Sequence, residues 1–192
     1  LVAVLTSLSF YVDPSTASRI APGVLWVSIA FAGVLAMGRT WARERDQNVM
    51  LALLLTPIPR ASIYVGKGLG SLAFLLVVEA ALVPLVAVLY QIDLTSVLGP
   101  LALLLLLGSI GFVAAGTLFA AMGVRTRSRE LMLSVVLFPL VTPALLAGVV
   151  ATRELFGGAS LGELGGWLRV LGAFDIIFVS TGVLLFEPLM SE

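Results

Sequence analysis

Two carboxylates interrupt long apolar stretches of the sequence and are its first candidates for chemistry. Glu79 lies within the run from Gly68 to Tyr90, and Asp175 lies within the run from Trp167 to Phe186. An acidic side chain at the centre of a bilayer costs about 2.5–3.5 kcal/mol to insert, so it faces protein or water rather than lipid. We expect these residues either to line one outward-facing groove or, in a structural role, to be hydrogen-bonded between helices or protonated.

No nucleophile–base pair suited to hydrolysis stands out. Histidine and cysteine are both absent, which removes disulfides, thiol chemistry, most zinc sites and histidine-based acid–base or haem-ligating roles from this chain. Lys67 follows Gly66, as in a phosphate-binding loop. That loop, however, would need a glycine in place of Ala61 and a Ser or Thr in place of Gly68. We therefore expect no ATP site and no enzymatic activity in this chain, and we expect Lys67 to anchor a helix end.

The composition indicates an integral membrane protein. Of the 192 residues, 60% are hydrophobic and only 11% are charged, and the mean hydropathy is +1.14. A soluble domain of this length covers more of its surface with polar side chains. Lys and Arg number 11, and so do Asp and Glu, so no basic excess indicates nucleic-acid binding.

The pattern of apolar runs predicts an all-α, polytopic bundle that forms a single transmembrane domain over residues 1–192. Leu1–Val12 covers roughly 18 Å of a core about 30 Å thick, so we interpret it as the end of a first span. Residues 13–19, 91–96 and 125–130 are expected loops, as is a glycine-rich stretch that carries Arg153 and Glu154. The full protein would have six membrane spans, counting this first one. The other five predicted spans are Ile20–Gly38, Gly68–Tyr90, Val97–Val124, Leu131–Ala151 and Trp167–Phe186.

The distribution of Lys and Arg predicts the orientation. Cytoplasmic loops of membrane proteins carry the excess of these residues. Only Arg19, Arg153 and Arg169 fall on one side of the predicted bundle. We therefore expect the other side, with the C-terminus, to be cytoplasmic. The basic residues on that side are Arg39, Arg43, Arg45, Arg60, Lys67, Arg125, Arg127 and Arg129.

The stretch "RERDQNVMLALLLTPIPR" (43–60) lies in a predicted cytoplasmic segment, 39–67. Its charged start offers contacts of both signs, whereas residues 49–55, about 10 Å long as a helix, cannot span a bilayer. Such a segment needs the membrane interface or a groove in a partner protein, and its prolines end the helix. The expected contact residues are Arg43, Glu44, Arg45, Asp46, Met50, Leu53, Leu54, Pro57 and Pro59. A second cytoplasmic loop carries Arg125, Arg127, Arg129 and Glu130.

Small residues and prolines have mainly structural explanations. Residues 108–123 place small side chains at helical spacing, which favours close helix packing or subunit contact. Gly66 and Gly70 offer a smaller face of the same kind. Pro139 and Pro143 either kink the fifth predicted span or break it at a substrate path.

Four segments together resemble the CcmB family, the haem-exporter-type permeases of cytochrome c maturation. They are "IAPGVLWVSIAFAG" (20–33), "LLLTPIPRASIYVGK" (53–67), "GTLFAAMGVRTRSRELMLSVVLFPLVTP" (116–143) and "AFDIIFVSTGVLLFE" (173–187). The likeness covers nearly the whole chain in matching order. One departure is that Asp46 is followed by Gln47 and Asn48, where the family usually has Asp-Gly.

The resemblance implies six spans and a separate ATP-binding subunit, which residues 43–60 would contact. It also implies other membrane proteins of cytochrome c maturation, and we expect two copies of the chain in the complex. ATP would bind to the partner, and haem would be handled by the complex rather than held as a cofactor by this chain alone. The ATP-driven step is either haem export or release of a haem-loaded periplasmic chaperone. The absence of histidine favours release, because only Met and Tyr remain as axial ligands.

Two other functions remain open at this point. The chain would fit a permease of another ABC exporter, moving lipid, drug or polysaccharide, and it would also fit an assembly scaffold without transport. An intramembrane hydrolase is a minor alternative, because Asp175 lacks the glycine-flanked setting of an aspartyl protease and Lys67 sits at a membrane edge.

Overall fold

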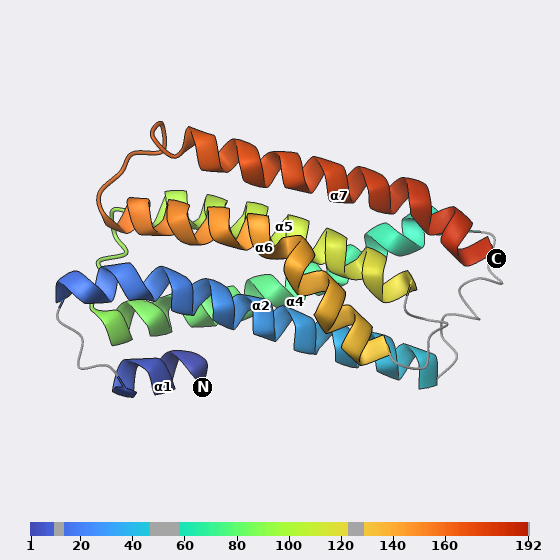
Figure 1. Cartoon of the computed structure of the whole chain (residues 1–192), viewed down its shortest axis with the longest axis horizontal. Helices are drawn as coiled ribbons and strands as arrows, with labels where there is room; N and C mark the ends of the chain where they lie inside the picture. Colours follow the sequence, from blue (N-terminus) through green and yellow to red (C-terminus); the bar gives the residue numbers. More distant parts are fainter. Residues whose placement is uncertain (10–13, 47–57, 123–128, 192) are drawn as a thin grey trace.

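All regular secondary structure in the described part of the chain is α-helical. The computed structural model describes residues 1–9, 14–46, 58–122 and 129–191. Its elements run side by side along one long direction (Figure 1). They are α1 (Val2–Ser9), α2 (Pro14–Asp46), α4 (Arg60–Tyr90), α5 (Leu98–Met122), α6 (Arg129–Phe156) and α7 (Gly165–Ser191).

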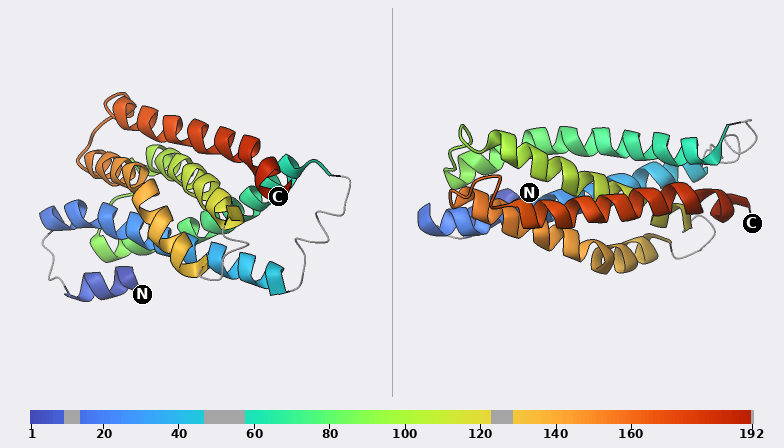
Figure 2. Two further views of the ribbon diagram at one scale, coloured as in Figure 1. Left: turned by 45° about the vertical axis from the view of Figure 1, so that its right-hand side comes forward. Right: turned by 90° about the horizontal axis from the view of Figure 1, so that it is seen from above.

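Five of these helices are long and apolar enough to cross a membrane, which confirms the predicted polytopic α-helical class. They pack with successive helices in opposite directions, so alternate connections lie at opposite ends of the bundle (Figures 1 and 2). Among the described residues, the first predicted span is represented by α1, whose eight residues cover about 12 Å. Residues 10–12 of that span lie outside the described residues, so six spans stay a prediction. The membrane-length segments are Arg19–Gly38, Arg60–Tyr90, Leu98–Met122, Val136–Phe156 and Gly165–Phe186.

The helices extend further than the hydropathy pattern predicts. The loop expected at 13–19 is wrong, because α2 begins at Pro14; proline has no backbone N–H to satisfy, so it suits the first turn of a helix. α4 begins at Arg60, directly after Pro59, so Lys67 lies inside this helix and does not mark its end. The loop expected to carry Arg153 and Glu154 is wrong for these two residues, because α6 continues to Phe156. Hydropathy underestimates these helices because polar residues continue them beyond the apolar run.

The centre of the bundle is α5, whose glycines let neighbouring helices approach closely. The indole of Trp26, on α2, occupies the space in front of Gly108 on α5 and Gly148 on α6, and its Nε1 donates a hydrogen bond to Thr152 Oγ1 at 2.9 Å. Met37 packs against Gly116 in the same way. Gly108 and Gly116, two of the small residues in this stretch, therefore serve helix packing within one chain.

The proline pair of α6 bends this helix without ending it. Pro139 and Pro143 lie inside the helix, which changes direction in this region (Figure 1). A proline removes one helical hydrogen bond and crowds the preceding turn. The hydroxyl of Thr142 donates to the Phe138 carbonyl at 2.7 Å, a contact that often accompanies helix bending. The kink alternative is therefore the one observed.

Candidate functional sites

Glu79 lies on the inward face of α4. Its side chain is 4% exposed, and it accepts a hydrogen bond from the Ser109 hydroxyl on α5. The carboxylate faces protein rather than lipid, as expected for an acidic residue within a membrane. A hydrogen bond between two spanning helices also fixes the relative position of α4 and α5.

Asp175 lies on α7 and is buried without a hydrogen bond. It is 8% exposed, and neither of its carboxylate oxygens has a hydrogen-bond partner among the described residues. Its Oδ1 packs against Gly111 on α5, where an added Cβ would lie only 2.5 Å from it. An ionised carboxylate is costly in such a place unless it is paired. Asp175 is thus the less compensated of the two intramembrane acids.

The two carboxylates lie at similar depth but against different faces of α5. Ser109 and Gly111, which contact Glu79 and Asp175 respectively, are two positions apart, so they differ by about 3 Å in height and about 200° around the helix axis. The structure thus brings both acids to α5 without placing them side by side. Their predicted role in one outward-facing groove stays a prediction.

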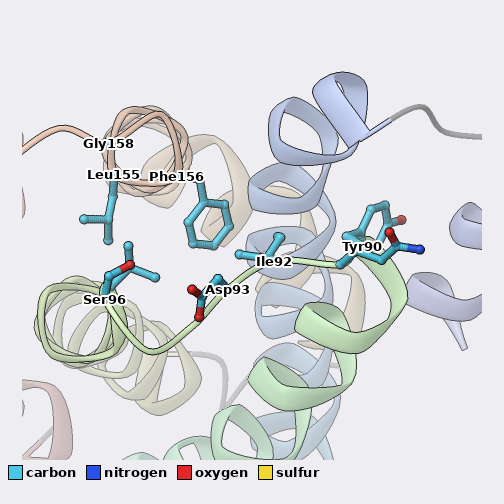
Figure 3. Close-up of a pocket in the computed structure, with 9 residues that line it drawn as sticks. Tyr90, Ile92, Asp93, Ser96, Leu155, Phe156 and Gly158 are labelled. Atoms are coloured by element: carbon cyan, nitrogen blue, oxygen red, sulfur yellow. The ribbon is translucent and has the colours of Figure 1, made fainter.

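A cavity of about 280 Å³ opens at the end of the bundle where α4 joins α5 and α6 leads into α7. Neither Glu79 nor Asp175 lines it. Its lining residues include Tyr90, Asp93 and Phe156 (Figure 3). Asp93 Oδ1 accepts hydrogen bonds from the Thr95 backbone N–H at 2.9 Å and the Thr95 hydroxyl at 2.6 Å. These two bonds hold the pKa of Asp93 below its ordinary value. We assign no ligand to this cavity.

The predicted cytoplasmic residues gather at the opposite end of the bundle. Figure 1 shows the end of α2, the start of α4, the end of α5, the start of α6 and the C-terminus there together. Arg43 to Asp46 form the last turn of α2, Arg129 and Glu130 begin α6, and Pro59 directly precedes α4. The predicted contact residues that fall outside the described ones are Met50, Leu53, Leu54, Pro57, Arg125 and Arg127.

Tyr64 is a buried residue near this end that sequence reasoning missed. It is 4% exposed, and its hydroxyl donates to the Ala114 carbonyl on α5 at 3.0 Å. The Phe178 carbonyl on α7 lies at 3.4 Å from the same hydroxyl. The only sequence signal is a tyrosine in the first turns of an otherwise small and aliphatic helix, which does not reveal its partners.

The described residues form no cluster of three or more His, Cys, Asp or Glu that could hold a metal ion. Their chemistry is instead that of helix ends and isolated buried polar groups.

Five antiparallel, membrane-length helices with two buried acids define a multi-pass α-helical membrane protein. The chain belongs to the CcmB protein family, whose model matches residues 1–186, and this confirms the resemblance seen in the sequence. It is 31% identical to "Heme exporter protein B" of Paracoccus denitrificans over 162 residues, or 81% of this chain and 72% of that protein. Its identity to the protein of that name from Bradyrhizobium diazoefficiens is 25%, over 94% of this chain and 81% of the relative. For the Haemophilus influenzae protein the identity is 28%, over 92% and 78%.

Proposed function

We propose that this chain is the membrane permease subunit of an ABC-type complex that serves haem export in cytochrome c maturation. The observation that carries the proposal is the family match over residues 1–186, together with relatives that are named heme exporter protein B. The chain has no ATP-binding pattern of its own, so a separate subunit would hydrolyse ATP. The helical bundle would convert that hydrolysis into movement.

The ATP-binding subunit would contact residues 43–60 on the cytoplasmic side. Support comes from the described flanks of this segment, because α2 continues through Arg43–Asp46 and α4 begins at Arg60. Helices that continue directly into a docking segment carry its displacement into the membrane. The Lys and Arg bias favours the same side for the C-terminus, in a bacterial inner membrane.

Haem, as the substrate of the complex, would take its axial ligands from a partner. The chain has no histidine or cysteine, and its two described tyrosines are occupied, since Tyr90 shares a hydrogen bond of 3.0 Å with Thr6 and Tyr64 donates to Ala114. Of the described methionines, Met37 is buried against Gly116, whereas Met122, at the end of α5, is exposed. The lack of histidine and cysteine and the occupied tyrosines favour ATP-driven release of a haem-loaded periplasmic chaperone over passage of haem through this chain.

Two copies of the chain would assemble in the complex. On α4, Gly66 and Gly70 are exposed, and a Cβ added to either would meet no atom within 4 Å. Small residues of this kind allow two spanning helices to approach closely.

The test is co-expression of the full-length protein with the candidate ATP-binding subunit in a strain that lacks its own copy. The double variant Glu44→Lys and Asp46→Lys should lose both the co-purifying ATPase and mature cytochrome c. The matched control is Arg19→Glu with Arg169→Glu, a double charge reversal of two exposed residues at the opposite end, and it should retain both. Normal assembly and maturation in the first variant would contradict the docking assignment. Maturation that continues with a hydrolysis-dead ATPase would instead support the scaffold alternative.

A further inference from the structure

Tyr64 joins three helices at the cytoplasmic end of the bundle. It belongs to α4, its hydroxyl donates to the Ala114 carbonyl of α5 at 3.0 Å, and its ring packs on α7. The ring centre lies 5.6 Å from that of Phe186 on α7. The same ring fills the space in front of Gly182, where α7 has no side chain. Tyr90, Trp26 and Trp167 hydrogen-bond to side chains instead.

The hydroxyl of Tyr64 has a choice of acceptors. The Phe178 carbonyl of α7 lies 3.4 Å away, compared with 3.0 Å for the Ala114 carbonyl of α5. A hydroxyl carries one proton, and the shorter contact is the better hydrogen bond. A displacement of α4 by a few tenths of an ångström toward α7 would therefore exchange one acceptor for the other without leaving the hydroxyl unpaired.

Tyr64 is also close to the segment that would contact the ATP-binding subunit. It is the fifth residue of α4, which begins at Arg60, so it lies about 6 Å along the helix from that start. A helix is stiff over one turn, so a push on residues 43–60 reaches Tyr64 before it reaches Glu79, which is about 29 Å from the start of the helix.

We propose that Tyr64 is the positioning residue that transmits movement of the cytoplasmic segment 43–60 from α4 to α5 and α7. The inference rests on the proposed function, because it requires an ATP-binding subunit that moves this segment. α4 rotates or slides, the Tyr64 hydroxyl changes its acceptor from α5 to α7, and the aromatic contact with Phe186 carries α7 along.

The first test is Tyr64→Phe in the complete complex, with Tyr90→Phe as the matched control. Both tyrosines lie on α4, are 4% exposed and have one hydroxyl contact of 3.0 Å, but Tyr90 bonds to Thr6 at the far end of the bundle. We expect Tyr64→Phe to keep the amount of complex and its ATPase rate while mature cytochrome c per ATP hydrolysed falls about two- to tenfold, which is the equilibrium value of one hydrogen bond. Tyr90→Phe should leave this ratio unchanged.

The second test leaves Tyr64 unchanged and fills the space that its ring occupies in front of Gly182. In Gly182→Ala the new methyl group would collide with the Tyr64 ring, whereas in Gly172→Ala, on the same helix, a Cβ meets no atom within 4 Å. Both changes favour the helix to the same extent, so only the collision differs. Gly182→Ala should uncouple hydrolysis from maturation as Tyr64→Phe does, and Gly172→Ala should not.

The outcomes separate the inference from the function on which it rests. If the unchanged protein neither binds an ATPase nor supports maturation, the proposed function fails. If it does both, and Tyr64→Phe and Gly182→Ala keep the wild-type ratio of maturation to hydrolysis, the role of Tyr64 is wrong and the function stands. Loss of complex in proportion to activity in both variants would also overturn the inference, because Tyr64 would then only stabilise the fold.

Discussion

The indole of Trp26 is held between two glycines, which makes Gly148 a sensitive position for a single added methyl group. Trp26 is 2% exposed, and a Cβ on Gly148 would lie 2.5 Å from its Cζ2 atom and 2.6 Å from its Cε2 atom. Carbon atoms in contact prefer about 3.5–4.0 Å. In Gly148→Ala the ring must therefore move by about 1 Å, which also disturbs its hydrogen bond to Thr152.

The expected cost follows from these two effects. Overpacking a well-filled interior costs about 1–3 kcal/mol, and an interhelical hydrogen bond in a membrane protein contributes about 0.6 kcal/mol on average. Alanine also favours a helix over glycine by about 1 kcal/mol. Gly23→Ala is the control, because it brings the same gain in helix propensity without a collision: Gly23 lies inside α2, and a Cβ there meets no atom within 4 Å. Relative to this control we expect Gly148→Ala to lower the free energy of unfolding by about 1.5–3.5 kcal/mol.

The assay is reversible unfolding of the purified full-length protein in mixed micelles, with the SDS midpoint followed by circular dichroism. The double variant Gly148→Ala with Trp26→Leu should lose less stability than the two single changes predict together, because the smaller side chain relieves the collision. Equal midpoints for Gly148→Ala and Gly23→Ala would refute the packing argument.

Two further predictions concern the acidic residues. If Glu79 and Asp175 form part of a working path, Glu79→Gln with Asp175→Asn should abolish cytochrome c maturation while the complex still co-purifies with its ATPase; normal cytochrome c levels in this variant would exclude that role. The second prediction concerns Asp93, in the loop between α4 and α5. Its carboxylate form stabilises this loop, because hydrogen bonds from Thr95 lower the pKa of Asp93 in the folded protein. This stabilisation is present above the ordinary pKa of Asp and is lost as pH falls through the depressed value. Thr95→Val should therefore raise the Asp93 pKa in a titration followed by NMR of labelled Asp, and an unchanged pKa would contradict the hydrogen-bond assignment.

The sequence determined the class, the approximate spans and the family. Long uncharged runs have one stable arrangement in a membrane, because a spanning segment must satisfy its backbone hydrogen bonds internally. This is why the interiors of the five described spans were predicted well. The ends were not, since Pro14 and the charged residues after Gly38 continue α2 without an apolar signal.

Only the tertiary structure decided what the individual polar side chains do. The sequence treated Glu79 and Asp175 alike, yet the first is bonded to Ser109 and the second has no partner among the described residues. The sequence shows Tyr64 only as a tyrosine in the first turns of α4 and does not indicate its partners. The physical reason is that hydropathy reports how much of a helix is apolar, whereas the partner of a buried polar group depends on helix rotation and on where neighbouring glycines allow close approach.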